Sequence, residues 1–411
     1  MRSDWSCTSN TRNSKSKLYI LTSMETVAVI FGGRSAEHDV SVVTALASVI
    51  KPLELTKQYR VEAIYIAKDG AWYWDDKLKD IKLFSSGKIQ DFLQKCSPVT
   101  MQFDGGLTIV KSGGLAARKQ TCKIDIAFPA MHGTYGEDGD LMGLLEMAGV
   151  PYVGSGVAAS ALAMDKVLAK QMAVVNQIPV TKFLHFTKTE LSLDSNHATT
   201  TITNNLTYPL FVKPAHLGSS IGISRVNSDA ELINALEVAS HYDDKVIVEE
   251  AVQNLIEVTL PIIGNDQPQA ALLEKPLTQT EDFFDFDTKY MQGGKKGGKG
   301  SGAKGAQGYS QIPADLPADL YAAAEKVGLD VYRALGCSGI ARVDMLIDSK
   351  TNQVFFNEVN PLPGGLYAHN WNKAGISNVE LVQKLVAFAK ERYAQKQAIA
   401  TTFTTNYLQQ F

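Results

Sequence analysis

Short runs of apolar residues alternate with amphipathic segments along the first third of the chain. Three runs have the length and the β-branched content that are typical of buried strands: 26–31 (TVAVIF), 60–67 (RVEAIYIA) and 123–130 (KIDIAFPA). Residues 41–50 and 140–149 have apolar positions at the spacing that predicts a helix. Strands that alternate with helices favour a parallel sheet, so we predict an α/β domain over residues 24–150.

The pattern becomes more helical after residue 150. A helical period covers residues 155–177 and has to end before Pro179. The polar stretch 191–205 (LSLDSNHATTTITNN) predicts a surface loop. From these changes, and from a Gly/Lys-rich segment between 291 and 308, we predict the following division: a disordered tail 1–23, a central domain 151–247, a C-terminal domain 248–395 with a lid at 284–310, and a tail 396–411.

Composition and charge favour a small metabolite as the partner and a reducing cytoplasm as the compartment. The chain of 411 residues is 45% hydrophobic and 20% charged, as expected for a soluble globular protein. Its formal net charge of -3 argues against a nucleic acid or a membrane surface as the partner. The four cysteines lack C-x-x-C spacing, which disfavours a zinc site and a disulfide framework. Met24 directly precedes the first predicted strand and is an alternative start of the chain.

A glycine- and serine-rich turn follows a predicted strand in LFVKPAHLGSSIG. Lys213 lies at the end of this strand, and Gly218, Ser219 and Ser220 follow, with backbone N–H groups and hydroxyls that could fold over phosphate oxygens. The order of residues matches neither a P-loop nor G-x-G-x-x-G. An ordinary Gly-Ser hairpin loop is the alternative.

Two carboxylates lie on successive apolar strands near the end of the chain. Arg342 stands two positions before Asp344, and Asn360 two positions after Glu358. Side chains at i and i+2 share one face of a strand, so these groups would form an oxygen-rich site that suits Mg²⁺ better than zinc. A salt bridge between Arg342 and either carboxylate is the alternative.

Two further polar groups follow strands of the first domain. Gly32 and Gly33 end the first strand, and Glu37 comes just before a helix, at the sheet edge where α/β proteins bind ligands. His132 follows another strand in HGTYGEDG. Glu37 could instead favour the helix N-terminus, and His132 could be a structural hydrogen-bonding residue.

Taken together, these motifs resemble the D-alanyl-D-alanine ligases, a family with the ATP-grasp fold. The resemblance covers residues 25–395 and rests on the order and spacing of FGGRSAEHDVS, HGTYGEDG, PYVGSGVAASALAMDK, KPAHLGSSIG, FFDFDTKY, ARVDM and NEVNPLPG. It implies three α/β domains, the first with a parallel sheet, and ATP held between the central and C-terminal domains. It also implies an enzyme that joins two D-alanines through an acylphosphate, releases ADP and phosphate, and supplies peptidoglycan precursors.

The resemblance assigns roles to the residues that match these motifs position by position. Residues expected to hold the first substrate or to stabilise the oxyanion are Glu37, His132, Ser219, Tyr290, Arg342 and Gly364. Residues expected to bind ATP are Lys166, Lys213, Ser219, Ser220, Glu249, Glu250, Val252, Glu257, Phe284 and Lys289. Two Mg²⁺ or Mn²⁺ ions are expected on Asp344, Glu358 and Asn360. A cytoplasmic homodimer without nucleic-acid or membrane partners is also implied.

The chain departs from the family pattern in three places. The ribose-binding Glu of G-R-E-I-E-V is missing from QNLIEV, where Glu257 is the nearest acid, and the lid is lengthened by Gly and Lys. His369 and Asn370 stand where the family has a Ser-Leu pair that contacts the second D-alanine. Tyr367 and Trp371 beside them are either core residues or substrate contacts. D-lactate, D-serine or another amino acid thus remains an alternative second substrate, and a nucleotide-binding module without ligase activity is the alternative from another class.

Overall fold

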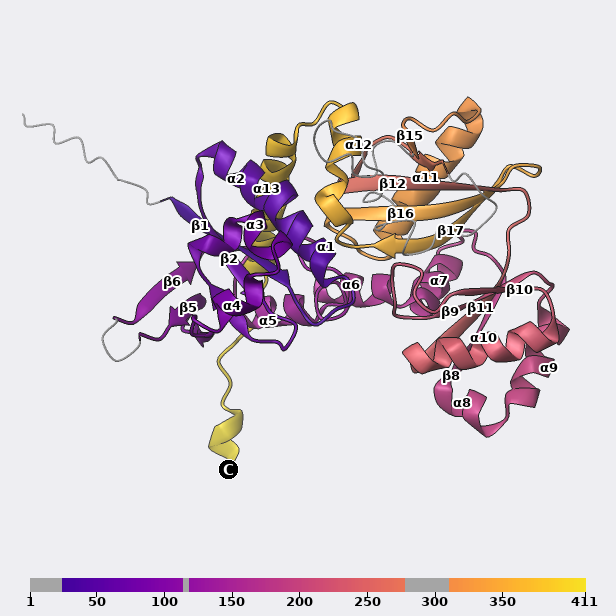
Figure 1. Cartoon of the computed structure of the whole chain (residues 1–411), viewed down its shortest axis with the longest axis horizontal. Helices are drawn as coiled ribbons and strands as arrows, with labels where there is room; N and C mark the ends of the chain where they lie inside the picture. The colour runs from indigo at the N-terminus through magenta and orange to yellow at the C-terminus, as the bar shows by residue number, and fades with distance from the viewer. Residues whose placement is uncertain (1–23, 114–117, 278–309) are drawn as a thin grey trace, which may run out of the picture.

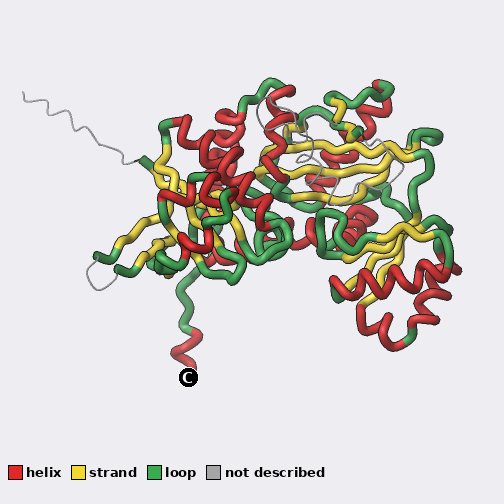
Figure 2. The backbone as a smooth tube through the Cα atoms, in the orientation of Figure 1, coloured by secondary structure: helices red, strands yellow, loops and turns green. Residues whose placement is uncertain are grey.

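The computed structural model describes residues 24–113, 118–277 and 310–411, which form three four-stranded sheets and two smaller ones. Two of the four-stranded sheets lie together at one end of the molecule and the third lies at the other end (Figures 1 and 2). The predicted tail 1–23, nearly all of the predicted lid, and Phe284, Lys289 and Tyr290 lie outside the described residues. Within these ranges, no helix combines the length and apolar composition that crossing a membrane requires.

The first sheet has the order β3-β2-β1-β7 and contains the predicted parallel strands. β1 pairs in parallel with β2 and β7, and β3 joins β2 as an antiparallel edge. Val29 and Ile30 of β1 enter cores on opposite faces, because helices cover this sheet on both sides. The elements of this part are β1 (Glu25–Gly32), α1 (His38–Val43), the π-helical η1 (Thr44–Ile50), α2 (Lys51–Thr56), β2 (Tyr59–Ile66), β3 (Trp72–Trp74), η2 (Asp76–Lys79), α3 (Ile81–Ser85), α4 (Ile89–Leu93), β7 (Ile126–Pro129) and α5 (Asp140–Ala148), with a separate antiparallel sheet of β4 (Val99–Phe103), β5 (Leu107–Lys111) and β6 (Gln120–Ile124).

The long helical period of residues 155–177 is divided into two helices at Asp165. This residue is extended, and its carboxylate accepts hydrogen bonds from Val167 N and Leu168 N, at 2.9 and 3.0 Å. Asp165 is therefore the N-cap of the second helix rather than a residue inside a single one. The two helices are α6 (Val157–Met164) and α7 (Lys166–Val175).

The second sheet is antiparallel and has the order β10-β9-β11-β8, with helices on one face (Figure 1). The predicted surface loop at 191–205 is wrong, because most of it is helical. A capping box between Thr187 and Glu190 starts the first helix, and Ile202 of the second is buried in the core. The elements are β8 (Phe183–Thr187), α8 (Lys188–Leu193), α9 (Ser195–Asn205), β9 (Leu210–Pro214), β10 (Ser224–Val226), α10 (Asp229–Tyr242) and β11 (Lys245–Glu250).

The third sheet is also antiparallel, with the order β13-β12-β16-β17. Its strands are β12 (Leu255–Gly264), β13 (Gln269–Ala270), β16 (Gly339–Asp348) and β17 (Gln353–Asn360), and β14 (Lys275–Pro276) pairs with β15 (Ser310–Gln311) beside it. The helical elements of this part are α11 (Ala318–Ala334), η5 (Gly364–Tyr367), α12 (Ala368–Lys373), α13 (Asn378–Gln397) and η6 (Tyr407–Gln410). α11 packs against β16 and β17 on the buried side of the sheet.

The last long helix, α13, returns to the first sheet. Its residues Leu381 and Leu385 share one core with Phe31 of β1. Arg392 of the same helix donates to the carbonyl oxygens of Tyr152 and Gly154 and to Ser338 Oγ. This helix therefore joins the first sheet to the segment that enters the third, and the domain boundaries expected from the sequence remain a prediction.

Candidate active site

One face of the third sheet carries the polar residues that the sequence pattern placed there. Along β16, alternate residues such as Val343 enter the core, whereas Arg342 and Asp344 lie on the opposite face. Asp344 pairs with Glu358 across the two strands, and Arg342 pairs with Asn360. The four residues predicted from the i, i+2 pattern therefore come together.

A β-bulge in β17 turns a further polar residue toward the second sheet. The register shifts by one residue next to the pair of Asp344 and Glu358, so that Asn357 is the extra residue. Asn357 Oδ1 accepts a hydrogen bond of 3.4 Å from Lys213 Nζ. The sequence analysis missed Asn357, because the run FFNEVN keeps its apolar and β-branched character through the bulge.

The salt bridge between Arg342 and Asp344, which was the alternative to a metal site, is present on this face. Arg342 Nε donates to Asp344 Oδ1 at 2.7 Å, and the Arg342 Nη2 group donates to Oδ2. Burial would lower the pKa of Arg342, but Asp344 raises this pKa well above its ordinary value, so the guanidinium stays charged. The ring centroid of Tyr367 lies 5.2 Å from Arg342 Cζ and covers another side of the guanidinium.

The same residues also fit a divalent cation. The side chains of Asp344, Glu358 and Asn360 offer the carboxylate and amide oxygens that Mg²⁺ prefers. Glu358 Oε2 lies 3.5 Å from Lys166 Nζ, and Asp344 is paired with Arg342. The two cations, Lys166 and Arg342, reduce the repulsion between the two acids.

A buried cluster of charges lies on the second sheet, facing Asn357. Glu249 at the end of β11 is paired with Lys213 Nζ at 2.6 Å and with Lys170 Nζ at 2.8 Å, and its Oε2 accepts a hydrogen bond from Thr181 at 2.6 Å. Although burial raises the pKa of Glu249, Lys170 and Lys213 lower it well below its ordinary value. The carboxylate is therefore charged and fixes both lysines.

Lys170 was missed by the sequence analysis. It stands four residues after Lys166 on α7 and thus lies on the same face of that helix. Its side chain is fully buried, and burial lowers the pKa of its amine. The i, i+4 spacing of two lysines in an apolar helix is the signal that could have found it.

Lys166 connects the second sheet to the third. Its Nζ donates to Leu217 O at 2.6 Å, in the loop after β9, and approaches Glu358 of β17 at 3.5 Å. The side chain is 8% exposed, so its charge lies in a largely desolvated position between the sheets. The amine of Lys166 on α7 thus contacts both the glycine-rich loop and the face of the third sheet that carries the carboxylates.

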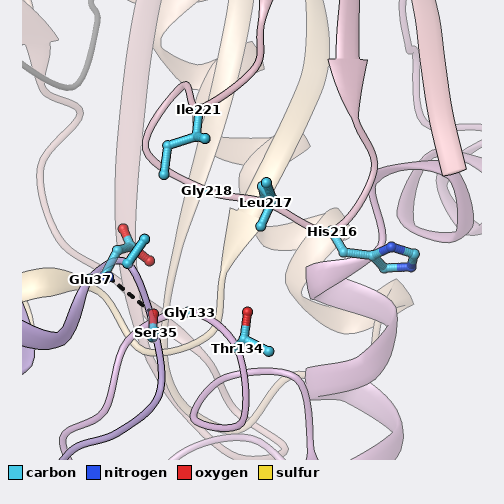
Figure 3. Close-up of a pocket in the computed structure, with 9 residues that line it drawn as sticks. Ser35, Glu37, Gly133, Thr134, His216, Leu217, Gly218 and Ile221 are labelled. Atoms are coloured by element: carbon cyan, nitrogen blue, oxygen red, sulfur yellow. Dashed lines mark hydrogen bonds between the residues drawn. The ribbon is translucent and has the colours of Figure 1, made fainter. Parts of the chain in front are cut away.

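The glycine-rich loop also contacts the first sheet. Ser219 Oγ donates to Glu37 Oε1, and Ser219 and Ser220 both have left-handed backbone conformations, with φ of 54° and 60°. Figure 3 shows Glu37 and Ser35 facing Gly218 of the loop across a small cavity of about 40 Å³. Left-handed residues other than glycine cluster at ligand-binding segments of proteins. Glu37 and Ser219, both expected to hold the first substrate, are thus in direct contact.

His216 fixes the start of this loop through ion pairs. Its Nδ1 lies 2.9 Å from Asp243 Oδ1 and its Nε2 lies 3.2 Å from Asp165 Oδ2. The hydrogen bonds to Asp165 and Asp243 raise the pKa of His216 to about 9, so the imidazole is charged at neutral pH. Within the described ranges, the ligand atoms of His216, Asp243 and Asp244 lie within 4.8 Å of one another, and ion pairing accounts for this cluster.

His132 is buried and does not open into the cavity. Its side chain is 3% exposed, with Nδ1 at 3.2 Å from Glu137 Oε1 and Nε2 at 2.8 Å from Thr44 Oγ1. Thr44 in turn accepts a hydrogen bond of 2.9 Å from the backbone N–H of Gly365, next to Gly364. The structure thus places His132 two hydrogen bonds from the turn that follows β17.

Comparison with protein families covers most of the chain. Residues 26–155 match the family model described as D-ala D-ala ligase N-terminus, and residues 173–387 match the one described as D-ala D-ala ligase C-terminus. The chain belongs to the D-alanine–D-alanine ligase family. This result confirms the predicted family and enzyme class, ATP-dependent ligases.

Individual members of the D-alanine–D-alanine ligase family agree with this result. The D-alanine–D-alanine ligase of Acetivibrio thermocellus is 37% identical in an alignment of 381 residues, which covers 89% of this chain and 96% of the relative. The solved D-alanine-D-alanine ligase from Coxiella burnetii has a TM-score of 0.73 and 26% identity, over 91% of this chain and 97% of that one. VanG D-Ala:D-Ser ligase from Enterococcus faecalis has a TM-score of 0.71 and 30% identity, over 89% and 99%. These neighbours confirm the predicted ATP-grasp fold.

The segment in which this family member departs from the expected pattern is well packed. His369 Nε2 donates to Glu274 Oε2 at 2.9 Å. Asn370 is fully buried, and its amide donates to Leu272 O and Glu274 and accepts from Leu272 N. Both N–H groups of this amide are therefore already engaged, whereas a second-substrate role for His369 stays a prediction. Trp371 is fully buried and is a core residue.

The remaining residues expected to bind nucleotide lie along β11 and β12. Glu250 Oε1 accepts a hydrogen bond of 2.9 Å from Thr207 N, and Val252 follows in the connection between the strands. Glu257 is half-buried on β12, two residues from Thr259, which pairs with Asp344. Glu257 thus shares the face that carries the metal-ligand candidates. Its role toward a ribose remains a prediction for this ligase.

Proposed function

We propose that this protein joins two D-alanines to D-alanyl-D-alanine with ATP, and that it does so between the second and third sheets. The observation that carries the proposal is the position of Lys166 Nζ, at 2.6 Å from Leu217 O and 3.5 Å from Glu358 Oε2. A phosphate between these elements would meet a cation, backbone and hydroxyl donors of the loop, and the carboxylates of a metal site.

In the first step, a carboxylate oxygen of one D-alanine attacks the γ-phosphorus of ATP, and ADP leaves with the electrons of the broken P–O bond. Lys166 and Lys213 offset the negative charge of the phosphate groups, and Glu249 holds Lys213 in place. A divalent cation on Asp344, Glu358 and Asn360 would supply further positive charge at the phosphate oxygens. The product is an acylphosphate, which activates a carboxylate that an amine could not otherwise attack.

In the second step, the amine of the other D-alanine attacks the acyl carbon. The charge that develops on the carbonyl oxygen is stabilised by the Arg342 guanidinium and by the backbone N–H of Gly364. The C–O bond to phosphate then breaks, phosphate leaves, and the amine loses a proton as the peptide bond forms. Glu37, which accepts a hydrogen bond from Ser219, binds the amino group of the first D-alanine.

The test is phosphate release by the purified protein with ATP, Mg²⁺ and D-alanine, with mass spectrometry of the product. We expect D-alanyl-D-alanine as the product and a loss of about 100-fold or more in kcat for Glu358→Gln, because a carboxylate that would hold the divalent cation is removed. No turnover with D-alanine in any pairing would refute the proposed reaction. An unchanged kcat of Glu358→Gln would refute the proposed metal site alone.

The second substrate is tested in the same assay with D-serine and D-lactate beside D-alanine. We propose D-alanine for this position, and a higher kcat/KM for another acceptor would replace it. We further propose a cytoplasmic compartment, in which the free thiols of Cys96, Cys122 and Cys337 would stay reduced. We also propose a homodimer, as the family resemblance implies. Cell fractionation and light scattering of the purified protein would test compartment and oligomeric state.

A further inference from the structure

The turn after β17 has a rare backbone conformation. Gly365, Leu366 and Tyr367 follow one another in the left-handed region, with φ of 60°, 55° and 51°. Only Gly365 adopts this region without steric cost, since the other two carry a Cβ atom. Such a turn persists only where its surroundings hold it, and such strain is frequent at functional sites. Gly364, which donates to the oxyanion in the proposed reaction, immediately precedes it.

The first part of the chain holds this turn from one side. Gly365 N–H donates to Thr44 Oγ1 at 2.9 Å, and Thr44 is the first residue of the π-helical segment η1. Leu366 is fully buried in the core that η1 and α13 share with the first sheet. Thr44 itself is 1% exposed, so no bulk water replaces its hydroxyl at the Gly365 N–H.

Behind Thr44 lies a chain of buried hydrogen bonds. Since the Thr44 oxygen accepts from Gly365, its O–H is left to donate to His132 Nε2, at 2.8 Å. His132 Nδ1–H then donates to Glu137 Oε1 at 3.2 Å, and Gly133 N–H donates to Glu137 Oε2 at 3.1 Å. With the proton of His132 on Nδ1, each polar atom of this chain has a partner of the correct polarity.

The other end of the chain reaches the first-substrate side of the site. A Cβ atom on Gly133 would meet Ser35 Oγ at 2.4 Å and Glu37 Oε2 at 3.0 Å, so the backbone of Gly133 lies directly against Glu37. Gly133 is in the left-handed region, with φ of 71°, which glycine adopts without strain. The residue proposed to bind the first amino group and the turn proposed to stabilise the oxyanion are thus connected.

We propose that Glu137, His132 and Thr44 form a positioning relay, which holds the Gly364 turn where its backbone donor meets the oxyanion formed when the second substrate attacks. This inference rests on the proposed function and adds to it: His132 acts through Thr44 and Gly365 rather than by touching substrate. The relay serves the second chemical step, because the oxyanion forms there and not during phosphoryl transfer.

The test compares the two steps in one experiment with ATP that carries ¹⁸O in its β–γ bridge. Movement of this label to the β-nonbridging positions reports reversible formation of ADP and acylphosphate, and dipeptide formation reports both steps. Thr44→Val keeps the shape of the side chain but removes the hydroxyl. A lost oxyanion donor lowers kcat by about 100–1,000-fold. Because Thr44 only supports that donor, we expect the rate of dipeptide formation to fall by about 10–100-fold, while isotope exchange changes less than about threefold.

Matched variants separate positioning from a loss of stability. Thr44→Ser keeps the hydroxyl and should restore the wild-type ratio of exchange to dipeptide formation. Ser41→Ala removes another buried hydroxyl, which accepts from Gly32 N at 2.7 Å and donates to Ala130 O at 2.8 Å, but does not reach the turn. It should leave the ratio unchanged even if it lowers the melting temperature. If Thr44→Val does not fold, Glu137→Gln replaces it, with an expected ratio change in the same direction.

Two results would overturn the relay. One is a ratio of isotope exchange to dipeptide formation in Thr44→Val that equals the wild-type ratio, with both rates reduced together. The other is an equal rise of the ratio in Ser41→Ala. A wild-type enzyme that shows neither exchange nor dipeptide with D-alanine would instead overturn the proposed function, and the relay with it.

Discussion

The ion pairs of His216 predict a specific dependence of stability on pH. This histidine holds the start of the glycine-rich loop between Asp165 and Asp243, and the two acids raise its pKa from 6.5 to about 9. A group whose folded-state pKa is raised stabilises the fold fully below its unfolded pKa, and this stabilisation is lost as the pH rises through the folded value. The contribution of His216 should therefore decline between about pH 6.5 and pH 9.

The magnitude follows from the same contacts. A rise in pKa from 6.5 to about 9 corresponds to roughly 3 kcal/mol. Because 42% of the His216 side chain is exposed, solvent screening reduces this figure to roughly 1–2 kcal/mol. With an unfolding entropy of about 2.1 cal/mol/K per residue, each kcal/mol moves the melting temperature of a chain of 411 residues by about 1 °C. We thus expect a loss of roughly 1–2 °C between pH 7 and pH 10 that His216→Gln does not show.

The assay is thermal unfolding of the wild type and His216→Gln across this pH range. Lysines and tyrosines also titrate there, so the quantity of interest is the difference between the two proteins at each pH. His241→Gln, in the last turn of α10, serves as the control, because this histidine makes a ring contact with Tyr242 but no ion pair in the described residues. Equal pH dependence in the wild type and His216→Gln, or a histidine pKa below about 7.5 by NMR, would refute the reasoning.

Three further changes have clear expected outcomes. Lys170→Met removes one cation from buried Glu249 and should cost about 3–5 kcal/mol in chemical denaturation; a loss below 1 kcal/mol would contradict the buried ion pair. Glu274→Gln frees the imidazole and the amide that it holds, and should raise KM for the second substrate about 3–10-fold without changing KM for ATP; an unchanged KM for the second substrate would separate that contact from specificity. Gly339→Ala should destabilise by about 1–3 kcal/mol, and by more than Gly336→Ala, because both have positive φ but only at Gly339 would the new Cβ meet backbone, Gly154 N at 3.0 Å; equal losses would show that the close approach is relaxed.

The sequence predicted those parts of the site that depend on local periodicity. Arg342 and Asp344 were placed on one face because strand residues alternate, and the apolar run around Glu358 identified the partner strand. Glu37 and Ser219 were linked only through family resemblance, because 182 residues separate them in the chain. Their contact depends on how the loop after β9 meets the first sheet, and local patterns do not encode that arrangement.

Other features could not be predicted because tertiary contacts decide them. The threonines and asparagines of α9 have low helix propensity, yet the N-cap at Asp194 and the burial of Ile202 make this segment helical. Leu366 and Tyr367 adopt backbone conformations that their side chains disfavour. His132 stands in a glycine-rich motif that is typical of an exposed loop. It is nevertheless buried, with a hydrogen bond to Thr44, which is 88 residues away in the chain.

The bulge at Asn357 decides which residues of β17 face the proposed active site. Before the bulge, Val354 and Phe356 enter the core, and after it the inward residue is Val359, so the alternation restarts with a shifted phase. Deleting Asn357 would restore regular alternation and leave Glu358 and Asn360 on the face opposite the core, whereas deleting Val359 would turn Asn360 toward the core. The position of a one-residue deletion in this strand should therefore decide how much activity remains, because only the second deletion moves a residue proposed to hold the metal.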